Sequence, residues 1–73
     1  MTVQTLRMRL YEGDRRHESW EEACDPDSAK ALRLALIAAI EAHGVCDPRE
    51  TLPRFHLEYQ TQTGGWRAFR AAA

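Results

Sequence analysis

The sequence predicts an α+β fold, a small two-layer sandwich with one α-helix packed on an antiparallel sheet of three to four strands, in the order β(β)αββ. Two observations predict it. Apolar and polar residues alternate near both ends of the chain, and a long segment rich in alanine and leucine separates the alternating stretches. Strands on both sides of a single helix favour an antiparallel sheet with the helix across one face. The 73 residues are expected to form one domain over 1–73, with a frayed end at 71–73.

The first strand is predicted within 2–11, where apolar residues occupy every second position. Those expected on its buried side are Leu6, Met8 and Leu10. A glycine–aspartate turn follows, and the segment 17–23 is a candidate second strand that carries Trp20 inward. Its three glutamates fit a strand poorly, which is why both three and four strands stay open.

The helix is predicted over 27–43, because alanine and leucine are strong helix formers and Gly44 follows as a stop. Asp25 and Asp47 each precede a proline, and both are predicted to cap the start of a helix. Alternation resumes over 54–62. A Thr-Gly-Gly turn then predicts a hairpin to a last strand at 66–70.

The predicted helix has apolar residues on two sides. At about 100° per residue, the stripe expected to face the sheet comprises Ala29, Leu32, Leu36, Ile40 and His43. Leu34 and Ile37 are predicted to lie on the far, polar side, next to a stripe of alanines. These two side chains predict that the helix is covered on more than one side, by a second copy of the chain or by a partner.

Arginines are predicted to line the sheet face away from the helix, together with an exposed His56. They are Arg7, Arg9, Arg54 and Arg67. Trp66 and Phe69 are three apart in a strand and are predicted on opposite faces, so at least one lies outside the core. Three uses of this face stay open: a solvated surface with arginine–glutamate pairs, a protein-docking surface, or a surface that stacks bases and holds phosphates.

The sequence gives little support for an enzyme or a metal-binding protein. Cys24 and Cys46 flank the predicted helix, which spans about 25 Å. A disulfide needs Cα atoms within about 7 Å, and a shared zinc ion needs a similar approach. Each cysteine is therefore predicted to be a small buried apolar residue. The three histidines show no metal-ligand spacing. We predict no catalytic residue, no cofactor and no metal.

The net charge and the hydropathy of the chain limit the classes of partner that we expect. The net charge of −1 argues against general polyanion binding. The chain lacks the roughly 18 consecutive apolar residues of a membrane span and an apolar signal core, so we expect a cytoplasmic protein that does not bind membranes. The core of so small a domain is marginal, and a partner or dimer interface would stabilise it.

The sequence therefore predicts a small non-enzymatic binding protein that acts through a protein–protein interface, as a homodimer or with a protein of unknown identity. Its size suggests an accessory or inhibitory factor of the kind found in phages and mobile elements. The alternative is a nucleic-acid-binding module that uses the arginine-bearing sheet face. The predicted partner-binding residues are Leu34, Ile37, Arg7, Arg9, Arg54, Arg67 and Trp66.

Overall fold

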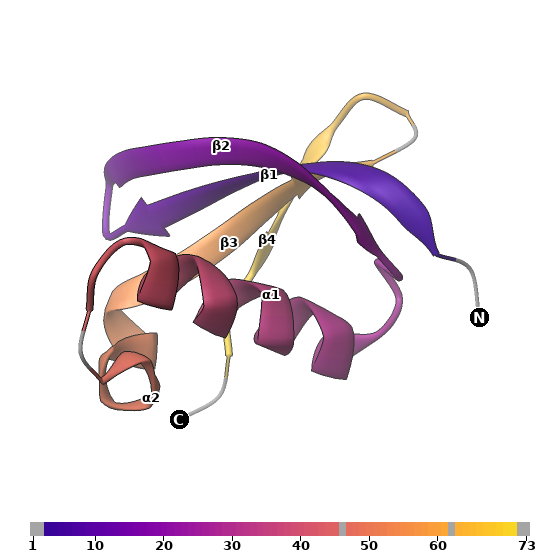
Figure 1. Cartoon of the computed structure of the whole chain (residues 1–73). Helices are drawn as coiled ribbons and strands as arrows, with labels where there is room; N and C mark the ends of the chain where they lie inside the picture. Colours follow the sequence, from indigo (N-terminus) through magenta and orange to yellow (C-terminus); the bar gives the residue numbers. More distant parts are fainter. Residues whose placement is uncertain (1–2, 46, 62, 72–73) are drawn as a thin grey trace.

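A computed structural model describes residues 3–45, 47–61 and 63–71. Its elements are β1 (Gln4–Glu12), β2 (Arg15–Cys24), α1 (Ala29–Ala42), the short helix α2 (Pro48–Thr51), the 3-10 turn η1 (Leu52–Arg54), β3 (Phe55–Gln60) and β4 (Trp66–Phe69). The four strands form one antiparallel sheet in the order β2-β1-β3-β4. Helix α1 lies across one face of that sheet (Figure 1). The predicted α+β sandwich is confirmed.

The core lies between α1 and the two central strands. β1 has one buried side, as its alternation predicts: its apolar residues are buried and the residues between them are not. β3 contributes a second apolar row, and α1 closes the core from the other side. The side chains that are completely enclosed are Met8, Leu10, Leu36, Ile40 and Leu57. Ala71 packs against this core, while 72–73, the rest of the predicted frayed end, lie outside the described residues.

β2 is a strand of ten residues that pairs with β1 along its whole length. Its glutamates are tolerated because β2 lies at the edge of the sheet, where Glu18 and Glu21 are exposed to solvent. Trp20 stands opposite Met8 and packs against the core, as predicted. The register shifts between Arg9 and Tyr11 of β1, which marks a bulge in this edge pair.

α1 begins three residues later than an Asp25 cap predicts. The Oγ of Ser28 accepts the N–H of Ala31 at 3.1 Å and is the helix cap. The carboxylate of Asp25 instead accepts the N–H of Asp27 at 3.0 Å, so it closes a turn ahead of the helix. The second predicted cap is confirmed, because the carboxylate of Asp47 accepts a backbone N–H at the start of α2.

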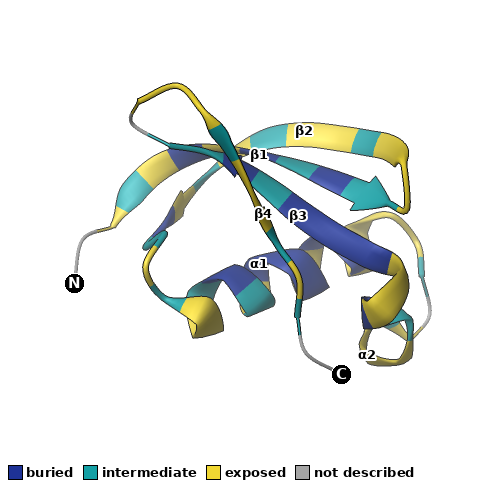
Figure 2. Ribbon diagram, turned by 180° about the vertical axis from the view of Figure 1, so that it is seen from behind, coloured by how far each residue is buried: buried dark blue, intermediate teal, exposed yellow. Residues whose placement is uncertain are grey.

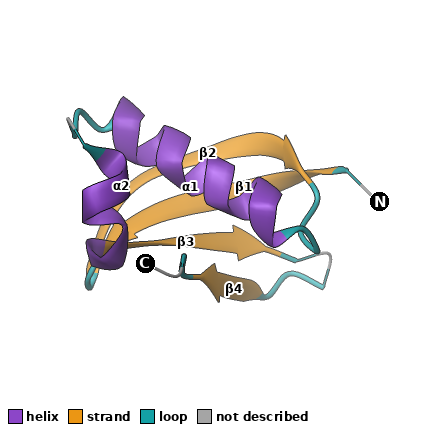
Figure 3. Cartoon of the chain, turned by 90° about the horizontal axis from the view of Figure 1, so that it is seen from below, coloured by secondary structure: helices purple, strands orange, loops and turns teal. Residues whose placement is uncertain are grey.

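The prediction that Ile37 lies on the outer side of α1 is wrong. Ile37 is 8% exposed and belongs to the core, whereas Leu34 is 57% exposed. The reason is the position of α2, which packs beside the C-terminal half of α1 (Figure 3). A helix that contacts both a sheet and a second helix buries a wider arc than a single stripe.

The sheet divides at one end. β1 pairs with β3 only from Met8↔Tyr59 to Glu12↔Phe55, and the residues of β1 before Met8 pair with β2 alone. β3 continues into its hairpin with β4, which turns through Gly64 at a φ of 87°. A positive φ is cheap for glycine, and this confirms the predicted turn. The hairpin tip and the start of β1 therefore diverge and leave a cavity between them.

Candidate functional site on the open face of the sheet

The sheet face away from α1 carries three arginines, Arg7, Arg9 and Arg16, together with the partly buried aromatic residues Tyr11 and Trp66. We call it the open face. The strand registers place on it Arg7, Arg9, Tyr11, Arg16, Ser19, Glu21, His56, Glu58, Gln60, Trp66 and Ala68. Burial differs along this side of the sheet, from the exposed edge strand β2 to the largely buried β3 (Figure 2). The predicted arginine-bearing face exists, but its membership differs from the prediction.

An arginine–tryptophan pair forms the centre of the open face. The guanidinium of Arg9 lies 3.5 Å from the centroid of the Trp66 ring, close enough for a strong cation–π contact. Glu58 stands opposite Arg9 in the register and forms an ion pair with it at 3.0 Å. The Arg9 side chain is 19% exposed, so both contacts are partly shielded from water. Arg9 and Trp66 are therefore held in one arrangement before any partner arrives.

A hollow of about 380 Å³ opens beside this pair, toward β2. Arg7 and Arg16 line it together with Arg9, and Glu21 is its acidic residue. Arg7 and Glu21 are both largely exposed and 3.9 Å apart, a separation at which an exposed ion pair contributes little. The hollow is therefore lined by more positive than negative charge, although the whole chain carries a net charge of −1.

His56 lies on the open face as predicted but is buried rather than exposed. Its ring stacks on Tyr11, with centroids 5.0 Å apart and an angle of 12° between the planes. The Nδ1 atom is enclosed and has no hydrogen-bond partner in the described part of the chain. Burial lowers the pKa of His56, and the charge of Arg70 acts in the same direction. The open face thus presents a neutral aromatic stack beside its arginines.

Arg54 and Arg67 do not lie on the open face. Arg54 belongs to η1, where the chain has not yet entered the strand, and its guanidinium pairs with the Glu12 carboxylate. That contact, followed by one from His17, lowers the pKa of Glu12. Arg67 follows Trp66 in β4 and stands opposite Tyr59, so it points to the helix side. Adjacent residues of a strand face opposite ways, and only Trp66 reaches the open face.

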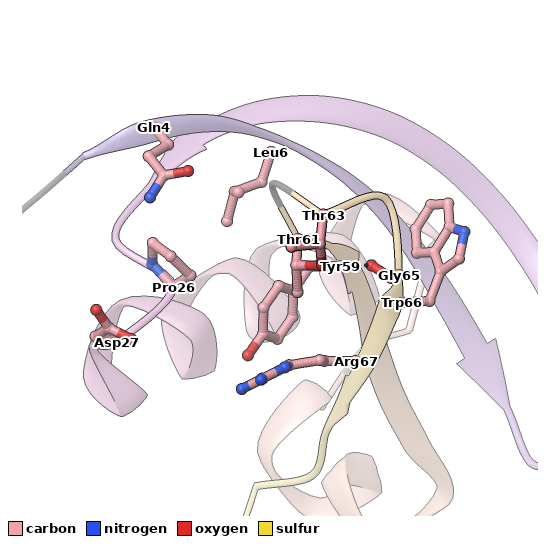
Figure 4. A pocket seen from close by; sticks show the side chains of 10 residues that line it. All are labelled: Gln4, Leu6, Pro26, Asp27, Tyr59, Thr61, Thr63, Gly65, Trp66 and Arg67. Atoms are coloured by element: carbon pink, nitrogen blue, oxygen red, sulfur yellow. Dashed lines mark hydrogen bonds between the residues drawn. The ribbon is translucent and has the colours of Figure 1, made fainter.

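Arg67 instead lines the cavity left where the sheet divides. This cavity holds about 430 Å³ and is walled by Leu6, Tyr59 and the Pro26 turn. In Figure 4 the side chains of Tyr59 and Arg67 lie side by side, while the Trp66 ring lies away from them. The volume falls in the range of small-molecule pockets. The side chains that line this cavity do not select one kind of ligand, because its walls come from several short segments open to solvent.

Leu34 and Ile37 do not form one surface, since only Leu34 is exposed. A separate groove of about 400 Å³ does run beside α1. Its apolar part consists of Trp20 from β2 and Ala38, Ala39 and Ala42 from α1. The sequence contained a sign of it in the stripe of alanines, but the groove exists only because β2 lies next to that stripe.

The remaining candidate chemistry is sparse. Cys24 is a free thiol buried in the core, and burial raises its pKa. Cys46 lies outside the described residues. His17 and His43 contact each other with ring centroids 4.1 Å apart, a contact that the sequence did not predict. Within 3–45, 47–61 and 63–71, no three histidine, cysteine or acidic side chains are placed to hold a metal ion.

Comparison of the chain with protein-family models, curated proteins and solved structures found no match. In the part of the chain that the structure describes, none of the helices has the length and apolar character needed to cross a lipid bilayer. What is shown is therefore a small α+β fold with one open sheet face, and function is argued from that geometry.

Proposed function

We propose that this protein is a non-enzymatic binding protein that docks an acidic surface of another protein on its open face, centred on Arg9 and Trp66. The observation that carries the proposal is the stack of Arg9 on Trp66 beside the arginine-lined hollow. Arginine, tryptophan and tyrosine are the residues that most often dominate the binding energy of protein interfaces.

Preorganisation of the pair supports the proposal. Arg9 is fixed between Trp66 and Glu58, and Tyr11 is fixed by its stack on His56. Side chains that are already ordered lose little conformational entropy on binding, about 0.5–1.5 kcal/mol less for each one that a partner need not immobilise. An acidic partner follows from the hollow, where arginines outnumber the single glutamate.

A nucleic-acid partner is the second candidate, because Arg9 and Trp66 could also hold a phosphate and a base. One feature favours the protein partner. Arg54 and Arg67, which the nucleic-acid alternative needs, lie elsewhere.

The biological role belongs to the same proposal. A domain that acts by occupying a surface of its partner is an accessory or inhibitory factor, of the kind that phages and mobile elements often encode. We also propose that it works in the cytoplasm. A homodimer is compatible with this role, because the open face does not include the outer edge of β2 or the exposed side of α1.

The test compares two arginines that differ in the face they occupy. Arg7→Glu and Trp66→Ala change the open face, while Arg67→Glu changes an exposed arginine on the helix side. A protein captured by the native chain from cells of its source would be purified and titrated with each variant. Trp66→Ala should weaken binding by about 30-fold or more, the loss typical of an interface hot spot.

Arg67→Glu is the matched control and should leave the affinity nearly unchanged. A purified partner that binds all variants alike, or that loses affinity only with Arg67→Glu, would show that the open face is not the docking site. A nucleic acid as the ligand would show itself by an affinity that falls steeply with salt, roughly in proportion to the number of phosphates neutralised.

A further inference from the structure

The outer edge of β2 is a second surface that the fold leaves unpaired. β2 is the terminal strand of the sheet, and its ten residues pair only with β1 among the described strands. Figure 3 shows it at the margin of the sheet, on the side to which the C-terminal half of α1 leans. An edge strand presents a row of backbone donors and acceptors that can pair with another strand.

The charges of β2 are divided between its two ends. The strand begins with Arg15, Arg16 and His17, has Glu18 next to them, and carries Glu21 and Glu22 near its end. If two copies pair through this edge in antiparallel fashion with Arg16 opposite Glu21, Arg15 stands opposite Glu22, so the basic beginning of each strand faces the acidic end of the other. A parallel arrangement would place like charges together. Charged side chains deter an unmatched strand from an edge, but these charges match a second copy of β2.

The surface beside the edge is apolar. The end of α1 lies against β2, since His43 Nδ1 is 3.3 Å from Glu18 Oε1. Between the two elements runs the groove of Trp20 and the α1 alanines. Trp20 stands near the middle of β2, so a two-fold axis through the centre of the paired strands would bring the grooves of both copies together. Ala38 is exposed on this flank, and Leu34, one turn earlier, is exposed as well.

We propose that two copies of this chain associate through antiparallel pairing of their β2 edges, with Trp20 and the exposed side of α1 around the two-fold axis. The pairing extends the sheet continuously across both copies and is closed by symmetry, so it stops at a dimer. It goes beyond the docking proposal, because it uses the edge of the sheet. Both Arg9–Trp66 centres would stay accessible on the same side of the joined sheet.

The test uses the self-complementary charges. Arg15→Glu with Arg16→Glu makes β2 acidic apart from His17, and Glu21→Arg with Glu22→Arg makes it basic apart from Glu18. Light scattering across a concentration range should show a dimer for the native chain. Each doubly substituted chain should dimerise at least about tenfold more weakly, because every attractive cross-strand pair becomes repulsive. An equimolar mixture of the two should form a mixed dimer.

The control reverses charges elsewhere. Arg49→Glu with Glu50→Arg changes the same residue types at exposed positions of α2 and should leave the dimer intact. Far-ultraviolet circular dichroism verifies that each variant is folded. Ala38→Glu tests the interface from the helix side without altering β2, and it should weaken the dimer as well, because it places a charge near Glu18 and Glu22.

Three results would overturn the proposal. They are a native chain that stays monomeric up to millimolar concentration, a dimer that survives both charge reversals, and a mixture of folded reversed chains that remains monomeric. If the reversed chains do not fold, Ala38→Glu decides, and an undiminished dimer overturns the proposal. Arg16 and Glu21 also line the hollow of the open face, but dimerisation is measured without a partner protein. The docking proposal is therefore decided separately, by its own test with Arg7→Glu and Trp66→Ala.

Discussion

Replacing Ile37 by alanine should destabilise the fold far more than replacing Leu34, its neighbour on the same helix. Ile37 is 8% exposed, and the substitution removes about three carbons at roughly 0.8 kcal/mol each, or about 2.4 kcal/mol. The cavity left behind brings the expected loss to about 2–5 kcal/mol. For 73 residues a total stability of roughly 4–11 kcal/mol is typical, so this loss is a large fraction of the whole.

Leu34 is 57% exposed, so less than half of its side chain leaves water on folding. Truncation should cost about 1 kcal/mol at most, and the higher helix propensity of alanine offsets part of it. Urea unfolding, followed by circular dichroism at a concentration where the chain is monomeric, measures both values. Equal losses for the two variants, or a larger loss for Leu34→Ala, would refute the assignment of Ile37 to the core.

Three further predictions follow from single contacts. Because burial lowers the pKa of His56 below its ordinary value of 6.5, the unfolded chain binds more protons, and stability should fall as the pH drops through 6.5 toward the folded value. His56→Gln should flatten that slope in urea unfolding measured at several pH values, and an unchanged slope would contradict the burial of the ring. Ser28→Ala should cost about 1 kcal/mol in the same assay, whereas Asp25→Ala should cost less; the reverse order would restore Asp25 as the cap. Cys24→Ser should lower stability by about 1–3 kcal/mol, because it buries a hydroxyl in an apolar core, while partner affinity should be retained; a selective loss of binding would mean that the thiol reaches the interface.

The fold was largely predictable because its strands and helix carry the expected periods. Alternation in β1 and β3 identifies their buried sides, and this requires only the two-residue repeat of a strand. β2 was harder, since an edge strand can carry charge on residues that a central strand would have to bury. Its full length is seen only in its pairing with β1.

The candidate site was only partly predictable, and each error has a spatial cause. The burial of Ile37 depends on where α2 packs, and the helical period of the sequence does not show this. The burial of His56 depends on Tyr11, its partner across the strand pair. The wrong placement of Arg67 on the open face is different, because the sequence alone was enough to avoid it. Because Trp66 and Arg67 are adjacent in one strand, the period of two already excludes both from the same face.

The division of the sheet gives the Arg9–Trp66 contact a second role. Backbone pairing between β1 and β3 ends at Met8↔Tyr59, yet the Trp66 ring reaches across β3 to Arg9 on β1. This side-chain contact therefore helps to tie the hairpin tip to the rest of the sheet.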